Sequence, residues 1–286
     1  MRAQRRKRSR SIDDVYADEH SWLSQGETKA TLSSRLLVRI LPYVERLNRA
    51  CSKVSNDAVL DTSAFPWVRT IERDWRTIRG ELDLVLTRKD ELPGFQDILA
   101  DVGSVTQDRG WKSFLMIGVG EKLPRNIAQC PQTWQILERI PGLSTAMFSI
   151  FEPGKHLEPH RGPYNGLLRL HLGLIVPDTS DNVAIRVGSR VCHWEEGRAL
   201  VFDDSYEHEA WNKSDRVRVV LFADFFRPLR FPANVINRML LAFALRSPFI
   251  RDARNKQRKW EAEFYGPEPR PSAGLAQDEV QIPPLS

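Results

Sequence analysis

The chain has 286 residues, 41% of them hydrophobic, so it can bury the core of one large domain or two small ones. Much of its formal net charge of +5 lies in the first ten residues, MRAQRRKRSR, and the rest of the chain is close to neutral. No run reaches the roughly 18 apolar residues that a membrane-spanning helix needs. The three cysteines lack CxxC spacing, which argues against a disulfide framework or a structural zinc site and favours a reducing, cytoplasmic setting.

Both ends of the chain are polar. Residues 1–30 are predicted to form a disordered basic leader, since no apolar stretch follows the charges as in a signal peptide. Binding of this leader to an anionic surface is an open alternative. No DNA-reading helix or RNA-binding motif accompanies the charge, so we expect no nucleic-acid partner. Residues 266–286, rich in Gly, Pro and Ser, are predicted to be a flexible tail.

Three segments before the middle of the chain have the apolar spacing of helices. Leu32 to Ser52 and Trp67 to Leu86 repeat apolar residues every three or four positions. Pro131 to Ile140 begins with proline and stops at a Pro-Gly pair, as helices often do. We expect these helices to cover another layer of structure.

From residue 146 the pattern changes to short β-strands. Six segments alternate or run apolar between Gly, Pro, Asn and Asp clusters: AMFSIF, LLRLHLGLIV, VAIRV, RVCHW, ALVFDD and VRVVLFADFF. Closely spaced antiparallel strands without helices between them predict an α+β protein. Its core is expected to be a double-stranded β-helix, a cupin-like jelly roll, over about 146–228, with helices before it and a helical segment over 233–265.

Five of the six histidines fall in this β segment: His156, His160, His171, His193 and His208. Period-two alternation places Leu168, Leu170, Leu172 and Leu174 on one face of their strand and Arg169 and His171 on the other. The same period places Arg218 beside Val220 and Phe222. A guanidinium on an apolar sheet face needs an anion. The interior could hold a metal and a small dicarboxylate, although spacing alone names neither.

Structural interpretations remain open at this point. Arg169 and Arg218 could each pair with a buried acid such as Asp203, Asp204 or Asp224. His156 and His193 have the character of structural histidines. Asp203 and Asp204 are expected to shape the turn that presents His208.

Three segments resemble the aspartyl/asparaginyl β-hydroxylase group of Fe(II)- and 2-oxoglutarate-dependent dioxygenases: FSIFEPGKHLEPHRGPYNGLLRLHLGLIVP, WEEGRALVFDDSYEHEAWN and RVRVVLFADFFRP. The resemblance implies a dioxygenase domain over 31–232. It also implies that His160 and His208 bind the iron without a carboxylate, and Gly162 stands where an HxD or HxE motif would carry one.

The same resemblance assigns the cosubstrate contacts. Arg218 is expected to bind the distal carboxylate of 2-oxoglutarate, supported by Ser149, while Arg169 and His171 contact the cosubstrate near the metal. The implied reaction consumes O₂ and 2-oxoglutarate, releases succinate and CO₂, and hydroxylates an unactivated C–H bond.

The substrate is the least determined part. A peptidyl or free Asp/Asn-type residue is the main expectation, and an acyl chain of lipid A or an ornithine lipid is the alternative. A non-catalytic β-barrel binding protein is a more remote alternative. Residues 235–259, an apolar stretch followed by basic residues, suit peripheral contact with the inner face of a membrane, or else a helix docked on the barrel. The oligomeric state stays open.

Overall fold

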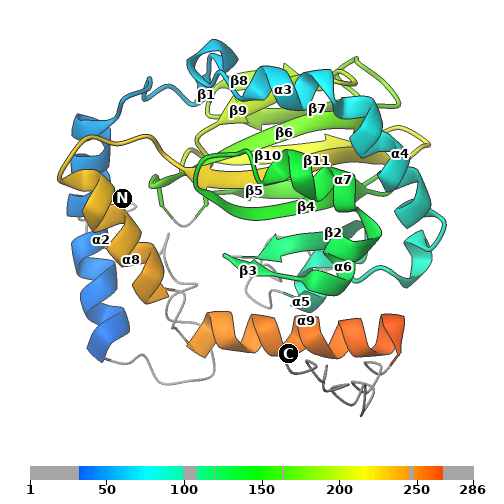
Figure 1. The fold of residues 1–286 in the computed structure, drawn as a ribbon. Helices are drawn as coiled ribbons and strands as arrows, with labels where there is room; N and C mark the ends of the chain where they lie inside the picture. The colour runs from blue at the N-terminus through cyan, green and yellow to red at the C-terminus, as the bar shows by residue number, and fades with distance from the viewer. Residues whose placement is uncertain (1–31, 99–107, 119, 163, 245–247, 267–286) are drawn as a thin grey trace, which may run out of the picture.

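A computed structural model describes residues 32–98, 108–118, 120–162, 164–244 and 248–266 of the chain. The predicted leader and nearly all of the predicted tail lie outside these residues. Figure 1 shows two antiparallel sheets facing each other, with helices on one side and around the ends.

The larger sheet has seven strands in the order β1-β9-β6-β11-β4-β2-β3, and the smaller has four in the order β5-β10-β7-β8. The strands of the large sheet are β1 (Val59–Leu60), β2 (Trp111–Gly118), β3 (Glu121–Lys122), β4 (Leu143–Phe151), β6 (Leu167–Ile175), β9 (Ala199–Phe202) and β11 (Arg218–Phe226). Those of the small sheet are β5 (His156–His160), β7 (Val183–Val187), β8 (Arg190–His193) and β10 (His208–Asn212). From β4 onward the chain passes back and forth between the sheets, four strands in each, which is the jelly roll that the sequence predicts.

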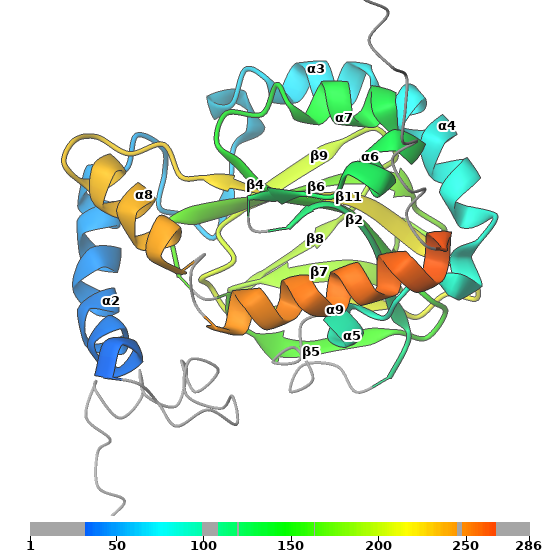
Figure 2. The same ribbon diagram turned by 60° about the horizontal axis from the view of Figure 1, so that its bottom comes forward.

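The two faces of the large sheet pack against different parts of the protein. Leu168, Leu170, Leu172 and Leu174 pack in a core with the helices α3 (Val68–Arg73), α4 (Trp75–Leu86) and α7 (Pro131–Leu137). The opposite face joins the small sheet in a second core around Phe151, Trp194, Phe202, Val220 and Phe222. Figure 2 shows the helices above the large sheet and the small sheet below it. The predicted alternation is therefore confirmed, and Arg169, His171 and Arg218 belong to the face between the sheets.

The sequence prediction differs from the structure in several places. The helical segment Trp67–Leu86 is two helices, because Asp74 leaves the helical conformation (φ −93°, ψ 12°) and its carboxylate binds Arg73. Strands β1, β2 and β3 of the large sheet precede residue 146 and were not predicted. Strands β5 and β10 of the small sheet were not predicted either, because their sequences, HLEPH and HEAWN, are polar and β5 contains a proline, so neither has the apolar alternation of a strand.

Helices α2 (Leu32–Cys51) and α8 (Ala233–Ala244) lie side by side at one end of the jelly roll (Figures 1 and 2). Helix α9 (Pro248–Tyr265) docks elsewhere, with Trp260 and Phe264 against the core and Arg258 paired with Glu121. Shorter helices are η2 (Thr62–Ala64), η3 (Lys89–Glu91), α5 (Phe95–Ile98) and α6 (Pro124–Gln129). Within the described residues, every helix is too short or too polar to cross a bilayer.

Candidate active site

His160 and His208 lie opposite each other on the adjacent strands β5 and β10. Their ring centroids are 4.2 Å apart. The register of β5 shifts here, because Leu157 pairs with Ala210 while His160 pairs with His208. This bulge carries one extra residue, so Leu157 and His160 share the interior face although they are three positions apart. The bulge therefore aims His160 at the same interior point as His208.

Each of the two imidazoles is held by a backbone carbonyl. The Nδ1 atom of His160 donates to the carbonyl of Glu158 at 2.7 Å, and Nδ1 of His208 donates to that of Tyr206 at 2.9 Å. Since a carbonyl can only accept, the proton lies on Nδ1 and the lone pair on Nε2. Burial lowers the pKa of His160 to about 4 and that of His208 well below its ordinary value. Two neutral imidazoles whose Nε2 atoms carry the lone pair suit a divalent metal.

Gly162 has no room for a side chain. A Cβ atom at this position would overlap the carboxyl group of Asp204, and the Gly162 amide donates to the Asp204 carbonyl at 2.8 Å. A carboxylate two residues after His160, as in a three-ligand motif, is therefore sterically excluded by the present packing. Among the described residues, no group of three or more His, Cys, Asp or Glu side chains is placed to share a metal ion.

Arg218 is a buried cation without a carboxylate partner in the described structure. The residue is 1% exposed, its Nε atom has no hydrogen-bond partner, and Nη1 reaches only the Ser149 carbonyl at 3.4 Å. Its guanidinium lies over Phe151 and Trp194, 3.7 Å and 4.6 Å from the ring centroids. Burial lowers its pKa to about 9. An anion bound beside this group would stabilise its charged form, and the described residues supply none.

Further unsatisfied polar atoms lie in the same interior. Both ring nitrogens of His171 and Nε1 of Trp194 are buried without partners. The His171 ring is 6.0 Å from Trp194 and 5.0 Å from Phe202, and Phe202 is 5.8 Å from His208. These contacts link the end of the interior that holds Arg218 to the end that holds the two histidines. Buried polar atoms without partners are uncommon, and a polar ligand bound in this interior would give these atoms hydrogen-bond partners.

Ser149 is buried beside this group, but its hydroxyl accepts a hydrogen bond from Nε1 of Trp111 at 3.0 Å. Its contact with Arg218 is made by the backbone carbonyl. That Ser149 supports binding of the cosubstrate stays a prediction. In the structure, its carbonyl is in a position to orient the Arg218 guanidinium.

Arg169 is paired with two carboxylates of the protein. It binds Asp224 through two hydrogen bonds of 2.8 and 3.1 Å, and Nη2 lies 2.9 Å from Asp204. These two carboxylates raise its pKa. The pairing of Arg169 with a buried acid, which the sequence left open, is therefore present in the structure. Its contact with the cosubstrate stays a prediction. Burial, together with repulsion from the carboxylates of Asp224 and Asp203, raises the pKa of Asp204 to about 7.

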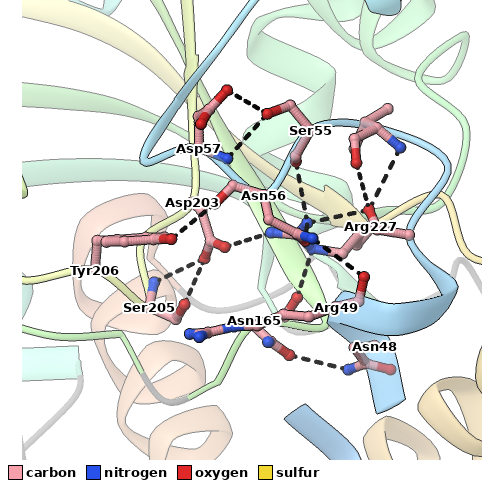
Figure 3. A network of polar contacts seen from close by, with 12 residues as sticks. Asn48, Arg49, Ser55, Asn56, Asp57, Asn165, Asp203, Ser205, Tyr206 and Arg227 are labelled. Atoms are coloured by element: carbon pink, nitrogen blue, oxygen red, sulfur yellow. Dashed lines mark hydrogen bonds and ion pairs between the residues drawn. The ribbon is translucent and has the colours of Figure 1, made fainter. Parts of the chain in front are cut away.

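Sequence reasoning missed Arg227, which connects the two loops around the histidines (Figure 3). Its guanidinium is fully buried in an ion pair with Asp203, and Nε donates to the Asn165 carbonyl at 2.9 Å. Asp203 in turn accepts from the backbone amide and hydroxyl of Ser205, which confirms that it shapes the turn before His208. Asn165 follows His160 by five residues. Arg227 is the first residue after β11, where the predicted alternation ends. This position is the only feature of the sequence that could have pointed to its role.

The two remaining histidines of the β segment pair with acids. His156 lies 3.0 Å from a Glu209 oxygen and His193 lies 2.9 Å from Asp181. Both are exposed at the surface of the small sheet, which fits the structural roles expected for them.

Comparison with known proteins identifies the family. The sequence profile described as Aspartyl/Asparaginyl beta-hydroxylase matches residues 72–228, more than half of the chain. The chain belongs to this family. As a member of the aspartyl/asparaginyl β-hydroxylase family, the protein is a hydroxylase, and the matched range contains all six residues predicted for the site.

Two relatives differ in how much of each chain is similar to this protein. The chain is 53% identical over 232 residues to the ornithine lipid ester-linked acyl 2-hydroxylase of Rhizobium tropici, covering 81% of this chain and 83% of that protein. It is 32% identical over 173 residues to the aspartyl/asparaginyl beta-hydroxylase of Homo sapiens, covering 59% of this chain but only 22% of the human protein. The similarity to the bacterial protein thus extends over nearly the whole length of both chains.

Similar solved structures include cupin proteins. A cupin domain from Bordetella pertussis matches 30% of this chain and 96% of its own with a TM-score of 0.23 and 16% identity. A protein described as a predicted oxalate decarboxylase from Thermotoga maritima matches 43% of this chain and 89% of its own, with a TM-score of 0.28 and 11% identity. At these scores the fold assignment rests on the strand order itself.

Proposed function

We propose that this hydroxylase depends on Fe(II) and 2-oxoglutarate and acts on an ester-linked acyl chain of an ornithine-type lipid. The observation that carries the cosubstrate assignment is the buried Arg218, whose charge no carboxylate neutralises among the described residues. A dicarboxylate is suited to such a site, because one end can pair with the guanidinium while the other reaches a metal.

The residues present fit the metal and the cosubstrate. His160 and His208 would hold the iron through Nε2, with Nδ1 fixed by backbone carbonyls. Arg218 would bind the distal carboxylate, and the unsatisfied nitrogens of His171 and Trp194 would offer further hydrogen bonds. When bound, iron and 2-oxoglutarate supply the oxidising power for C–H hydroxylation by O₂, and the cosubstrate leaves as succinate and CO₂.

The protein's own share in the reaction is orientation and exclusion of water. Phe151, Trp194 and Phe202 surround the interior with apolar surface, so charged groups bound there interact strongly. The ion pairs of Arg169 and Arg227 fix the strand ends and loops that carry the histidines. The imidazoles stay neutral at ordinary pH, so they do not require deprotonation before binding a metal.

The lipid substrate is favoured over the peptidyl or free Asp/Asn residue that the sequence made the main expectation. Support comes from the 53% identity to the ornithine lipid hydroxylase over most of both chains. The charge balance agrees, since Arg169 is already neutralised by Asp224 and Asp204 and is not free to bind an acidic substrate side chain. By this argument the 2-position of an ester-linked acyl chain is the site of hydroxylation.

The full-length protein should be incubated with Fe(II), ascorbate, 2-oxoglutarate and either ornithine lipid in detergent micelles or an Asp- and Asn-containing peptide. We expect mass spectrometry to detect one added oxygen atom on the lipid acyl chain, with an equal amount of succinate. His160→Ala is the control without activity. Hydroxylation of the peptide alone would contradict the substrate assignment, and turnover without 2-oxoglutarate would contradict the cosubstrate.

A further inference from the structure

Helix α8 leaves an apolar stripe uncovered in the described structure. Val235, Met239 and Phe243 follow each other at intervals of four residues and are 45%, 68% and 52% exposed. Residues four apart lie on one helix face, so these three side chains form a continuous row. Phe231, just before the helix, is 80% exposed. Large apolar side chains grouped in this way mark an interaction surface.

The neighbouring helix α2 has a smaller exposed group of the same kind. Tyr43 is 71% exposed and Ile40 is 40% exposed, whereas Leu41, Glu45 and Asn48 on the opposite face are buried. Both helices therefore use one face to attach to the jelly roll and present apolar side chains on another. We call α2 and α8 together the helix pair.

The exposed charged side chains on these two helical segments have one sign. Over the described residues 39–51 and 230–243, the exposed charged side chains are all arginine, and the acid in these ranges, Glu45, is buried. The arginines are Arg39, Arg46, Arg49, Arg230 and Arg238. Apolar side chains flanked by arginine are the composition of helices that lie in the interface of an anionic bilayer.

The charge also argues against a second copy of the chain as the occupant. A twofold contact through the helix pair would place the same arginine-rich surface on both sides, and like charges would face each other. An anionic bilayer, in contrast, neutralises the arginines and buries the apolar row. No described helix can span a membrane, so the contact would be with the bilayer surface.

The helix pair is attached to the loop that follows His160. Nδ2 of Asn48 on α2 donates to Oδ1 of Asn165 at 3.1 Å, and Nδ2 of Asn165 returns a bond to the Glu45 carbonyl at 3.0 Å. Nδ2 of Asn237 on α8 donates to the Gly166 carbonyl at 2.8 Å. Figure 3 shows the contact between Asn48 and Asn165 beside the Arg227 network. Both helices thus stand at the end of the jelly roll where the histidines lie.

We propose that the helix pair docks the enzyme on an anionic phospholipid bilayer and holds the histidine end of the jelly roll at the membrane surface. This proposal rests on the proposed function and deepens it, because docking at the membrane would bring a lipid acyl chain to the entrance of the interior. It also revises the predicted membrane segment 235–259: the contact is made by α8 together with α2, while α9 is docked on the protein.

The test is flotation of the full-length protein with vesicles of phosphatidylcholine alone or mixed with phosphatidylglycerol. We expect at least roughly tenfold stronger binding to the anionic vesicles, weakened by high salt. The double variant Met239→Ser, Phe243→Ser should lose about tenfold or more of that binding, because each side chain would bury a large apolar area. Leu84→Ser, which changes a leucine that is 67% exposed on α4, is the matched control and should bind as the parent does.

Several outcomes would overturn the proposal. It fails if the parent protein does not float with anionic vesicles, or if the double variant binds them equally while its thermal melt shows a folded protein. It also fails if light scattering finds a dimer that the double variant lacks, since the helix pair would then bind a second copy. Turnover of ornithine lipid in detergent micelles by the parent protein tests the proposed function separately, because it needs no vesicle.

Discussion

Two arginines on the same interior face of the large sheet have opposite surroundings. Arg169 and Arg218 are both largely buried and both lie over a phenylalanine ring, 4.2 Å and 3.7 Å from its centroid. Arg169 is bound by two carboxylates that raise its pKa, whereas Arg218 has none among the residues that the structure describes, and burial lowers its pKa to about 9. The difference separates a cation that is neutralised within the protein from a cation that we propose binds the cosubstrate.

The energetics of burial explain why a paired arginine and an unpaired arginine have different effects on stability. Removing a charge from water costs several kcal/mol, and a partner within the protein offsets this cost in every state of the molecule. A cation without such a partner destabilises the empty protein, and the deficit is recovered when an anion binds. The predictions that follow test this division between Arg169 and Arg218.

The largest effect is expected for Arg218→Met. Without the guanidinium, 2-oxoglutarate loses a buried, charge-assisted contact, and we expect turnover to fall at least about 100-fold, equivalent to roughly 3 kcal/mol. The melting temperature should stay the same or rise, because an unpaired buried charge is replaced by an apolar side chain of similar length. Succinate release and a thermal melt measure the two quantities.

A matched comparison sharpens this result. Added 2-oxoglutarate at about ten times its Kd should stabilise the metal-loaded parent protein by about 1.4 kcal/mol and leave Arg218→Met unchanged. If the methionine variant instead unfolds at a clearly lower temperature, Arg218 has a structural role and the comparison with Arg169 is wrong.

The second effect concerns stability. Asp224→Asn removes the bidentate partner of Arg169 but leaves Asp204 in place, so we expect the free energy of unfolding to fall by about 3 kcal/mol. Urea denaturation with linear extrapolation measures it. Asp181→Asn, at a carboxylate that is 91% exposed and paired with His193, serves as the control and should change stability by less than about 0.5 kcal/mol. Equal effects in the two variants would mean that the buried pair contributes no more than a surface pair.

The smallest effect is expected for Gly162→Ala. The added methyl group must displace the Asp204 carboxyl from its contact with Arg169, at a cost of about 1 to 3 kcal/mol in unfolding free energy. Gly80→Ala is the control, because no atom lies within 4 Å of a Cβ there and alanine favours the helix. A Gly162→Ala protein as stable as Gly80→Ala would show that Asp204 moves freely and that its ion pair with Arg169 is weak.

From β4 onward, the sequence predicts the strands of the large sheet better than those of the small sheet, for a physical reason. Strands with one face on the helices and one on the interior, such as β6 and β11, have strict alternation that places Leu168, Arg169 and Arg218 correctly. Strands β5 and β10 carry the histidines and have no such alternation, because a bulge and a proline interrupt the first and polar residues dominate the second.

Contacts between distant segments were beyond the reach of the sequence. Asp203, Asp204 and Asp224 were all considered as partners for Arg169 and Arg218, but only the packed structure assigns two of them to Arg169 and the third to Arg227. The pairing of the two histidines came from the family resemblance, and their tautomers came from the backbone carbonyls that the fold places beside Nδ1.

The overlap between position 162 and Asp204 also constrains how this site could be redesigned. Installing a carboxylate at residue 162, beside the two histidines, requires that residue 204 be shortened in the same step, since each single change leaves either a steric clash or an empty space beside Arg169. The two positions are therefore epistatic. In a library that varies residue 162 alone, variants with Asp or Glu at this position would be lost because the side chain clashes with Asp204.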